Sequence, residues 1–209
     1  MTTLLLVRHG ATDWNDANRA QGHADIALNA RGRAQAREAA ERLAACDLHA
    51  VFSSDLVRAL DTARAIARVH GLEVVVDPDL REIDQGDWTG LTDGEIKMEW
   101  PDRWGPARHF SARPGGESPA QVRHRALRAV ARIVDAHPSG TVAAVSHGVT
   151  IRTLVAEALA LDERGSARLR GLGNGGILSL EARVLDGRAL LRDPVRWDGR
   201  TPDRDDPNQ

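Results

Sequence analysis

Short, fully apolar runs alternate along the chain with longer stretches whose apolar residues recur every three or four positions. Residues 4–7 and 142–145 are apolar throughout. Runs of this length are too short for a helix and are typical of buried parallel strands. Mainly apolar segments at 50–52, 73–76 and 176–182 predict further strands. Since helical stretches separate them, the pattern predicts an α/β fold.

Capping signals mark where the helices between these strands begin. Asn29 is placed to cap a helix with apolar residues at helical spacing, and a second helix begins after Asp55 and stops before Gly71. Thr92 with Glu95, and Ser118 with Gln121, fit capping boxes. The last of the main helices follows the run at 142–145.

Together these elements predict a three-layer sandwich, in which helices flank a mostly parallel central sheet. Residues 84–117, which hold several tryptophans, are less regular and predict a small flap inserted over the carboxyl ends of the strands. We expect one domain over residues 1–193. Residues 194–209 are rich in Pro, Asp and Arg and are expected to form an extended or mobile tail.

Composition excludes several classes of function. The formal net charge of −2 over 209 residues leaves no broad basic field for nucleic acid. Lys97 is the only lysine and Cys46 the only cysteine, so the chain has no lysine-bearing phosphate loop and no intrachain disulfide. No apolar run is long enough for a signal peptide or a membrane span. We therefore expect a cytoplasmic protein without a membrane partner.

Candidate chemistry lies where the two apolar runs end. The first leads into Arg8-His9-Gly10 and the second into Ser146-His147-Gly148. In open α/β sheets, ligands bind beyond the carboxyl ends of the strands, so both histidines are expected at one rim. Arginine recognises anions, and a histidine at neutral pH is a nucleophile or moves a proton. The pattern indicates a site for a transferable anion, most simply a phosphoryl group.

Two further residues have both a structural and a functional interpretation. Arg58 lies in the first turn after the second strand and is either a solvated helix residue or a second guanidinium at the rim. Glu82 follows a strand-like segment and is either a surface carboxylate or an acid that protonates a leaving alkoxide. Their positions alone do not separate these alternatives.

Several ordered motifs give the chain a family resemblance from Leu4 to about Ile177. The motifs are residues 6–15 (LVRHGATDWN), Gln21-Gly22, 53–59 (SSDLVRA) with Thr62-Ala63, 80–90 (LREIDQGDWTG), 114–118 (PGGES) and 145–148 (VSHG). Each motif is weak by itself, and the similarity rests on their occurrence together in this order. With them the chain resembles the histidine phosphatase superfamily, in the branch of cofactor-dependent phosphoglycerate mutases and small acid-type phosphatases.

The resemblance implies a role for each candidate. His9 would be the nucleophile that becomes phosphohistidine, and Glu82 would be the acid for the leaving group and then the base for water. Family members need no metal or other cofactor for this step, and we see no metal-ligand spacing. The phosphate pocket would consist of Arg8, Arg58 and His147, lined further by Asn15 and Gln21.

The resemblance also leaves a choice of reaction. The family's mutases are usually longer, and the 114–118 motif is more similar to the phosphatases, so we favour hydrolysis of a small phosphorylated metabolite such as a sugar phosphate or a phosphoglycerate derivative. Mutase-type phosphoryl transfer is the alternative. A phosphate- or phosphoprotein-binding module with little catalysis is a third reading, against which the full set of candidate residues argues. A homodimer is left open.

Overall fold

A six-stranded sheet forms the centre of the computed structural model, which describes residues 1–104 and 111–196. The strand order is β3-β2-β4-β1-β5-β6. The first four strands in this order run parallel, β5 runs antiparallel to β1, and β6 runs antiparallel to β5. The predicted mostly parallel sheet is confirmed. The strands are β1 (Thr2–Arg8), β2 (Leu48–Ser53), β3 (Val74–Val76), β4 (Gly140–Ser146), β5 (Ile177–Leu185) and β6 (Arg188–Arg196).

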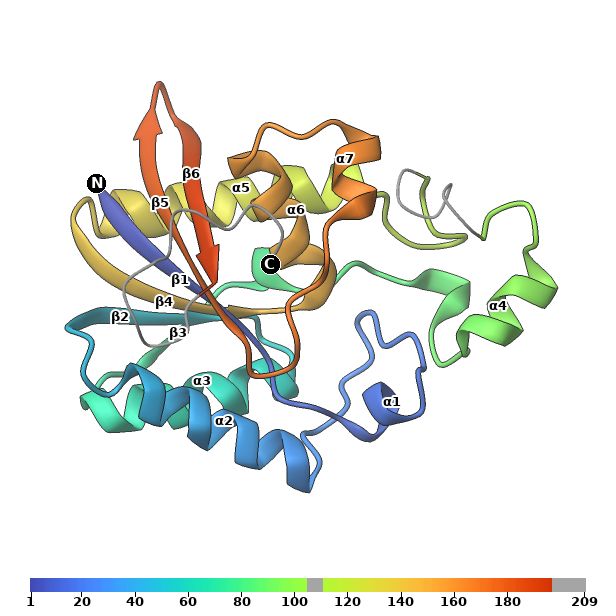
Figure 1. Ribbon diagram of the computed structural model, residues 1–209, viewed down its shortest axis with the longest axis horizontal. Coiled ribbons are helices and arrows are strands. Elements are labelled where there is room, and N and C mark those ends of the chain that lie inside the picture. The colour runs from blue at the N-terminus through green and yellow to red at the C-terminus, as the bar shows by residue number, and fades with distance from the viewer. Residues whose placement is uncertain (105–110, 197–209) are drawn as a thin grey trace.

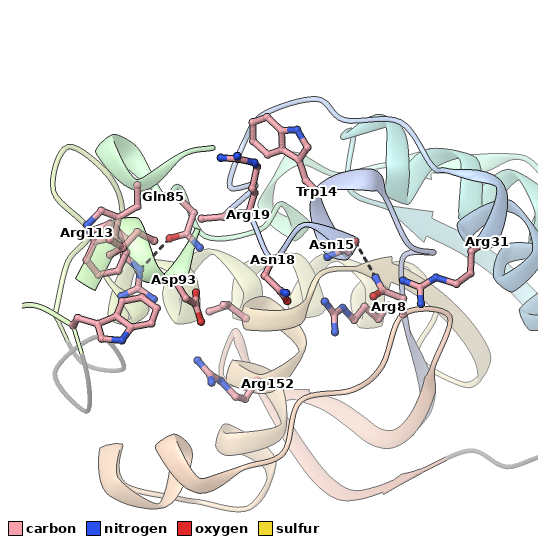
Figure 2. Close-up of a pocket in the computed structure, with 16 residues that line it drawn as sticks. Arg8, Trp14, Asn15, Asn18, Arg19, Arg31, Gln85, Asp93, Arg113 and Arg152 are labelled. Atoms are coloured by element: carbon pink, nitrogen blue, oxygen red, sulfur yellow. Dashed lines mark hydrogen bonds between the residues drawn. The ribbon is translucent and has the colours of Figure 1, made fainter. Parts of the chain in front are cut away.

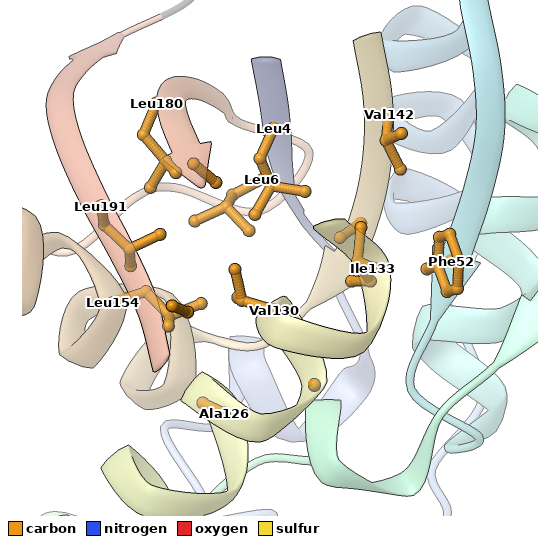
Figure 3. Packing of buried hydrophobic residues seen from close by; sticks show 14 of the residues in the cluster. Leu4, Leu6, Phe52, Ala126, Val130, Ile133, Val142, Leu154, Leu180 and Leu191 are labelled. Atoms are coloured by element: carbon orange, nitrogen blue, oxygen red, sulfur yellow. The ribbon is translucent and has the colours of Figure 1, made fainter. Parts of the chain in front are cut away.

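Helices cover both faces of the sheet, as Figure 1 shows. Helices α2 (Ala30–Leu43) and α3 (Val57–His70) lie on one face, and α5 (Pro119–Ala136) and α6 (Gly148–Ala158) lie on the other. Because strand side chains alternate, Leu4 and Leu6 join the core under α5 and α6 (Figure 3), whereas Leu5 and Val7 join the core under α2 and α3. The predicted three-layer sandwich is therefore confirmed.

Capping interactions fix the helix ends close to the predicted residues. The Asn29 side chain accepts from the amide of Gly32 at the start of α2, and Gly71 ends α3 in the left-handed conformation. Ser118 forms a capping box at the start of α5, and Thr92 forms one at the start of α4 (Asp93–Glu99).

The segment predicted as a flap lies beyond the carboxyl ends of the parallel strands (Figure 1). It contains the short 3-10 helix η2 (Gly86–Trp88) and α4, while its residues 105–110 lie outside the described part of the chain. The centroid of the Trp88 ring lies 6.5 Å from that of the Trp100 ring and 6.0 Å from that of the Trp104 ring. Backbone bonds from residues 19–20 to residues 90–92 tie this segment to the loop after β1.

Four local features differ from the sequence-based expectation. The segment before Glu82 is the 3-10 helix η1 (Pro78–Leu80) and not a strand, since proline at its start favours a turn. The short helices α1 (Asp13–Asp16) and α7 (Glu163–Arg168) were not predicted. Strand β6 was not predicted either, and it continues past residue 193 to Arg196, so the first residues of the expected tail belong to the sheet. Residues 197–209 lie outside the described part of the chain.

Over the residues described, no helix is long and apolar enough to cross a membrane.

Candidate active site

Strand register brings the two histidines together. Arg8 of β1 pairs with Ser146 of β4, so His9 and His147 follow adjacent parallel strands at the same rim. The His9 amide donates to the Ser146 carbonyl at 3.1 Å. The two imidazole rings lie with centroids 5.0 Å apart and planes inclined by 55°. The sheet therefore places both histidines at one rim, as predicted.

A backbone carbonyl sets the tautomer of His9. Its Nδ1 lies 2.7 Å from the carbonyl oxygen of Gly10, which can only accept, so Nδ1 carries the proton and Nε2 keeps its lone pair. Burial lowers the pKa of His9 well below its usual value, and the positive charges of Arg58 and Arg8 lower it further. The ring is therefore neutral and nucleophilic at neutral pH.

Two glycines let the loop that carries His9 pack directly on helix α2. A Cβ atom on Gly10 would lie 2.2 Å from the Gly32 carbonyl oxygen, and a Cβ atom on Gly32 would lie 1.9 Å from the Ala11 carbonyl oxygen. On the other side, the Gly10 amide donates to Thr62 Oγ1 of α3 at 3.1 Å. Both helices of this layer thus hold the loop in place.

Arg58, which is buried, and Arg8, which is partly buried, have guanidinium groups held by backbone carbonyls. Arg58 donates to the carbonyls of Gly22 and Ala24, each at 2.7 Å, and Arg8 donates to that of Leu172 at 2.6 Å. Burial lowers the pKa of both, that of Arg58 to about 10, while the charge of Glu82 opposes the shift. Both side chains remain cations at neutral pH.

Several buried polar atoms of the site have no hydrogen-bond partner among the described residues. They include Nε of Arg8, Nε of Arg58, both ring nitrogens of His147 and Oε1 of Gln21. Burial lowers the pKa of His147 well below its usual value, and the charge of Arg58 adds to this effect. Buried polar groups are nearly always satisfied, so a cluster of unsatisfied N–H groups indicates a place for an anion.

The Glu82 carboxyl group lies against the start of α6. Its Oε1 accepts from the amides of Ile83 at 2.9 Å and Val149 at 3.1 Å. The Glu82 main-chain carbonyl accepts from Arg125 at 2.9 Å and lies 2.8 Å from His23 Nε2. Glu82 is thus fixed at both its carboxyl group and its backbone, beside the helix that follows His147.

Asn15 is joined to the backbone of His9 by a residue that the sequence analysis missed. Asn174 donates from its Nδ2 to the His9 carbonyl at 3.0 Å and to Asn15 Oδ1 at 3.3 Å. Asn15 also closes the capping box of α1, and Gln21 is buried. The sequence did contain a pattern that could have identified Asn174, because it is a single polar residue in a glycine-rich stretch directly before β5.

A cavity of about 480 Å³ opens above this rim (Figure 2). Arg8 and Asn15 are among the residues that line it, and Figure 2 shows Arg152 and Arg113 on different sides of the opening. Its wall is cationic and partly aromatic. The lining comprises Arg8, Arg19, Arg31, Arg113 and Arg152, the tryptophans 14, 88 and 104, the polar residues Asn15, Asn18, Gln85 and Asn174, the carboxylate Asp93, and Ala20, Ile96 and Val149.

The described residues contain no cluster of three or more His, Cys, Asp or Glu side chains arranged to hold a metal ion.

This fold and rim belong to a known class of enzymes. Residues 4–190 match the model of the histidine phosphatase superfamily, branch 1. The chain belongs to this family.

Named relatives include both phosphatases and a mutase-like protein. The chain is 36% identical over 211 residues to a glucosyl-3-phosphoglycerate phosphatase of Mycolicibacterium vanbaalenii, with 93% of this chain and 91% of the relative covered. It is 41% identical over 160 residues to phosphoglycerate mutase-like protein 4 of Arabidopsis thaliana, with 72% and 68% covered.

The solved structures include a mycobacterial glucosyl-3-phosphoglycerate phosphatase in complex with VO3. It matches with a TM-score of 0.82 and 36% identity, over 91% of this chain and 96% of that one. The predicted family, its fold and its phosphatase character are confirmed by these comparisons.

Proposed function

We propose that this protein hydrolyses phosphomonoesters through a phosphohistidine on His9. The observation that carries the proposal is the cluster of buried, unpartnered N–H groups on Arg8, Arg58 and His147 around a neutral histidine. Two guanidinium groups and an imidazole suit the three oxygens of a phosphoryl group. A nucleophile with a free lone pair lies beside them.

In the first step, Nε2 of His9 attacks phosphorus and the bond from phosphorus to the ester oxygen breaks. Glu82, as a carboxylic acid, gives its proton to that oxygen, and the alcohol leaves. Arg8, Arg58 and His147 stabilise the charge on the moving phosphoryl group, while Asn15 and Gln21 line its pocket. In the second step, Glu82 takes a proton from water, the water oxygen attacks phosphorus, and the P–N bond breaks. Inorganic phosphate leaves and His9 is restored.

The cavity above the rim supports a substrate with a second anionic group. Among the described residues, five arginines and one carboxylate line it, together with three tryptophans that suit a sugar face or an apolar face. A phosphoglycerate ester has a carboxylate next to its phosphate, and the related mycobacterial enzymes are named for such a compound that also carries a glucosyl group. A phosphorylated carboxylic acid, with or without a sugar, is the substrate class we propose.

Phosphate release from matched substrates, measured in the presence of EDTA, tests the proposal. One pair is 3-phosphoglycerate and glycerol 3-phosphate; another is phosphoserine and phosphoethanolamine. The first member of each pair has a carboxylate that the second lacks. A hydrogen bond to a charged group contributes about 1.5–3 kcal/mol, so kcat/KM should be about 10–100-fold higher for the carboxylate.

Different outcomes separate the competing functions. Activity should survive chelation, since His9 and the arginines supply the chemistry; complete loss in EDTA that Mg²⁺ or Zn²⁺ restores would overturn the mechanism. Phosphoryl exchange between phosphoglycerates without net hydrolysis would assign a mutase. Phosphate binding without turnover of any substrate would assign a binding module.

The partners, the compartment and the oligomeric state of the enzyme are also part of the proposal. The net charge of −2 supports a protein without a nucleic-acid partner, and the single cysteine suits the cytoplasm. Light scattering on the purified protein distinguishes a monomer from a homodimer.

A further inference from the structure

The short segment of residues 21–25 links the phosphate pocket to helix α3. The carbonyls of Gly22 and Ala24 hold the Arg58 guanidinium. Asp25 Oδ1 accepts from the amide of Val57, the first residue of α3, at 2.7 Å. The segment is therefore held both by Arg58 and by the start of α3.

The same segment reaches the other side of the site through the side chain of His23. Its Nε2 lies 2.8 Å from the Glu82 carbonyl oxygen. A carbonyl can only accept, so Nε2 carries a proton whether the ring is neutral or charged. His23 thus connects the segment that holds the phosphate-binding arginine to the backbone of the proposed acid.

We propose that His23 is a positioning residue, which sets the place of the Glu82 carboxyl group relative to the phosphoryl group. The inference rests on the proposed function of Glu82 as acid. The Nε2 of His23 faces the main-chain carbonyl of Glu82, so His23 acts through Glu82 and not on the substrate. A displacement of about 1 Å in a catalytic group can cost about 10²-fold in rate, which gives such a contact its importance.

The charged groups around His23 do not prevent its Nε2–H from donating to the Glu82 carbonyl. Nδ1 lies 4.0 Å from Asp84 Oδ2, and Nε2 lies 4.0 Å from Glu117 Oε2. Although burial works in the opposite direction, hydrogen bonds from Arg125 lower the pKa of Glu117, which is therefore ionised at neutral pH.

The two arginines beside His23 and Glu82 are each bonded to a carboxylate. Arg125 bonds Glu117 and shares the Glu82 carbonyl with His23. Arg81 is paired with Asp55. Since the Nε2 proton is present in both ring states, substitution of His23 should lower activity without changing the shape of the pH profile.

The leaving group provides the test, because an acid matters most when the leaving group is poor. We compare kcat/KM for glycerol 3-phosphate and for 4-nitrophenyl phosphate. Glu82→Gln should lose about 10²–10⁴-fold on the alkyl substrate and much less on the aryl substrate. His23→Ala should show the same selectivity at smaller size, about 10-fold to 10²-fold on the alkyl substrate.

Two amides separate positioning from general structural damage. Glutamine places its side-chain NH2 as many bonds from Cβ as Nε2 of histidine, whereas asparagine reaches only the position of Nδ1. His23→Gln should therefore restore most of the alkyl-phosphate activity, and His23→Asn should behave as His23→Ala does. His49→Ala is the matched control, since this exposed histidine lies at the start of β2, at the far end of the strands.

Each outcome decides between the possibilities. Selective loss in His23→Ala, rescue by glutamine and an unchanged pH profile support positioning, as does a double variant with Glu82→Gln no worse on glycerol 3-phosphate than Glu82→Gln alone. Equal losses on both substrates, equal rescue by asparagine, or a shifted pH profile overturn it. If Glu82→Gln itself shows no leaving-group selectivity, the acid assignment in the proposed function fails first.

Discussion

At the scale of single residues, the site is built from groups that would be costly to bury without a ligand. The Arg58 side chain is fully buried, and His147 has both ring nitrogens buried without a partner among the described residues. Unsatisfied buried polar groups cost about 1–3 kcal/mol each. A phosphoryl group that bonds them offsets this cost, which explains how a neutral imidazole pair and two guanidinium groups recognise one anion.

Removal of the nucleophile gives the most direct test at this scale. His9→Ala should abolish hydrolysis of every phosphomonoester, while circular dichroism and thermal unfolding show that the fold is kept. Rapid mixing with a ³²P-labelled substrate should trap an acid-labile, base-stable phosphoenzyme in the wild type only. Retention of more than a few per cent of turnover in the pure variant would show that His9 is not the nucleophile.

The sequence was sufficient to propose residues that come directly after strands, and insufficient for those placed by tertiary contacts. His9 and His147 follow apolar runs whose register the parallel sheet determines. Asn174 bonds the His9 carbonyl from a loop 165 residues away, and His23 reaches Glu82 across 59 residues. No local pattern encodes such contacts, although the glycine-rich setting of Asn174 was a usable signal.

At the scale of elements, periodicity and caps predicted the main helices and strands, but they did not predict two short helices and one edge strand. Helix α1 has four residues and α7 has six, too few for a periodic pattern. Strand β6 mixes charged with apolar residues and contains Pro194, which a strand tolerates at the edge of a sheet. Its hairpin had a signal, since Asp186 and Gly187 both adopt positive φ between β5 and β6, the typical Asp-Gly turn.

The contact between α2 and the loop of His9 leads to a prediction for an element. Gly32→Ala would place a methyl group 1.9 Å from the Ala11 carbonyl oxygen, so the helix must shift away from the loop. Such overpacking costs about 1–3 kcal/mol in unfolding free energy, and kcat should fall with it. Urea unfolding and initial rates measure both, with Gly171→Ala as the control, because apart from its chain neighbours no described residue has an atom within 4 Å of that Cβ position. Equal stability of the two variants would contradict the close packing.

At the scale of the whole molecule, the two buried histidines make stability depend on pH. An unfolded chain protonates histidine with a pKa near 6.5, whereas burial holds the pKa of His9 and His147 well below that value in the folded state. The folded protein therefore binds fewer protons below pH 6.5, and acid favours unfolding. The stabilisation is fully present above pH 6.5 and is lost as the pH falls toward the folded pKa values.

From pH 7.5 to 5.5, each such histidine should lower the free energy of unfolding by on the order of 1 kcal/mol, and the pair by about twice that. Urea titrations in phosphate-free buffer at both pH values measure the change. The paired carboxylates Asp55, Asp79 and Glu117 have lowered pKa values and titrate mainly below this window. His9→Asn and His147→Asn should each remove about half of the pH dependence. If both active-site variants keep the full pH dependence of the wild type, the two imidazoles are not the neutral pair on which the proposed nucleophile depends.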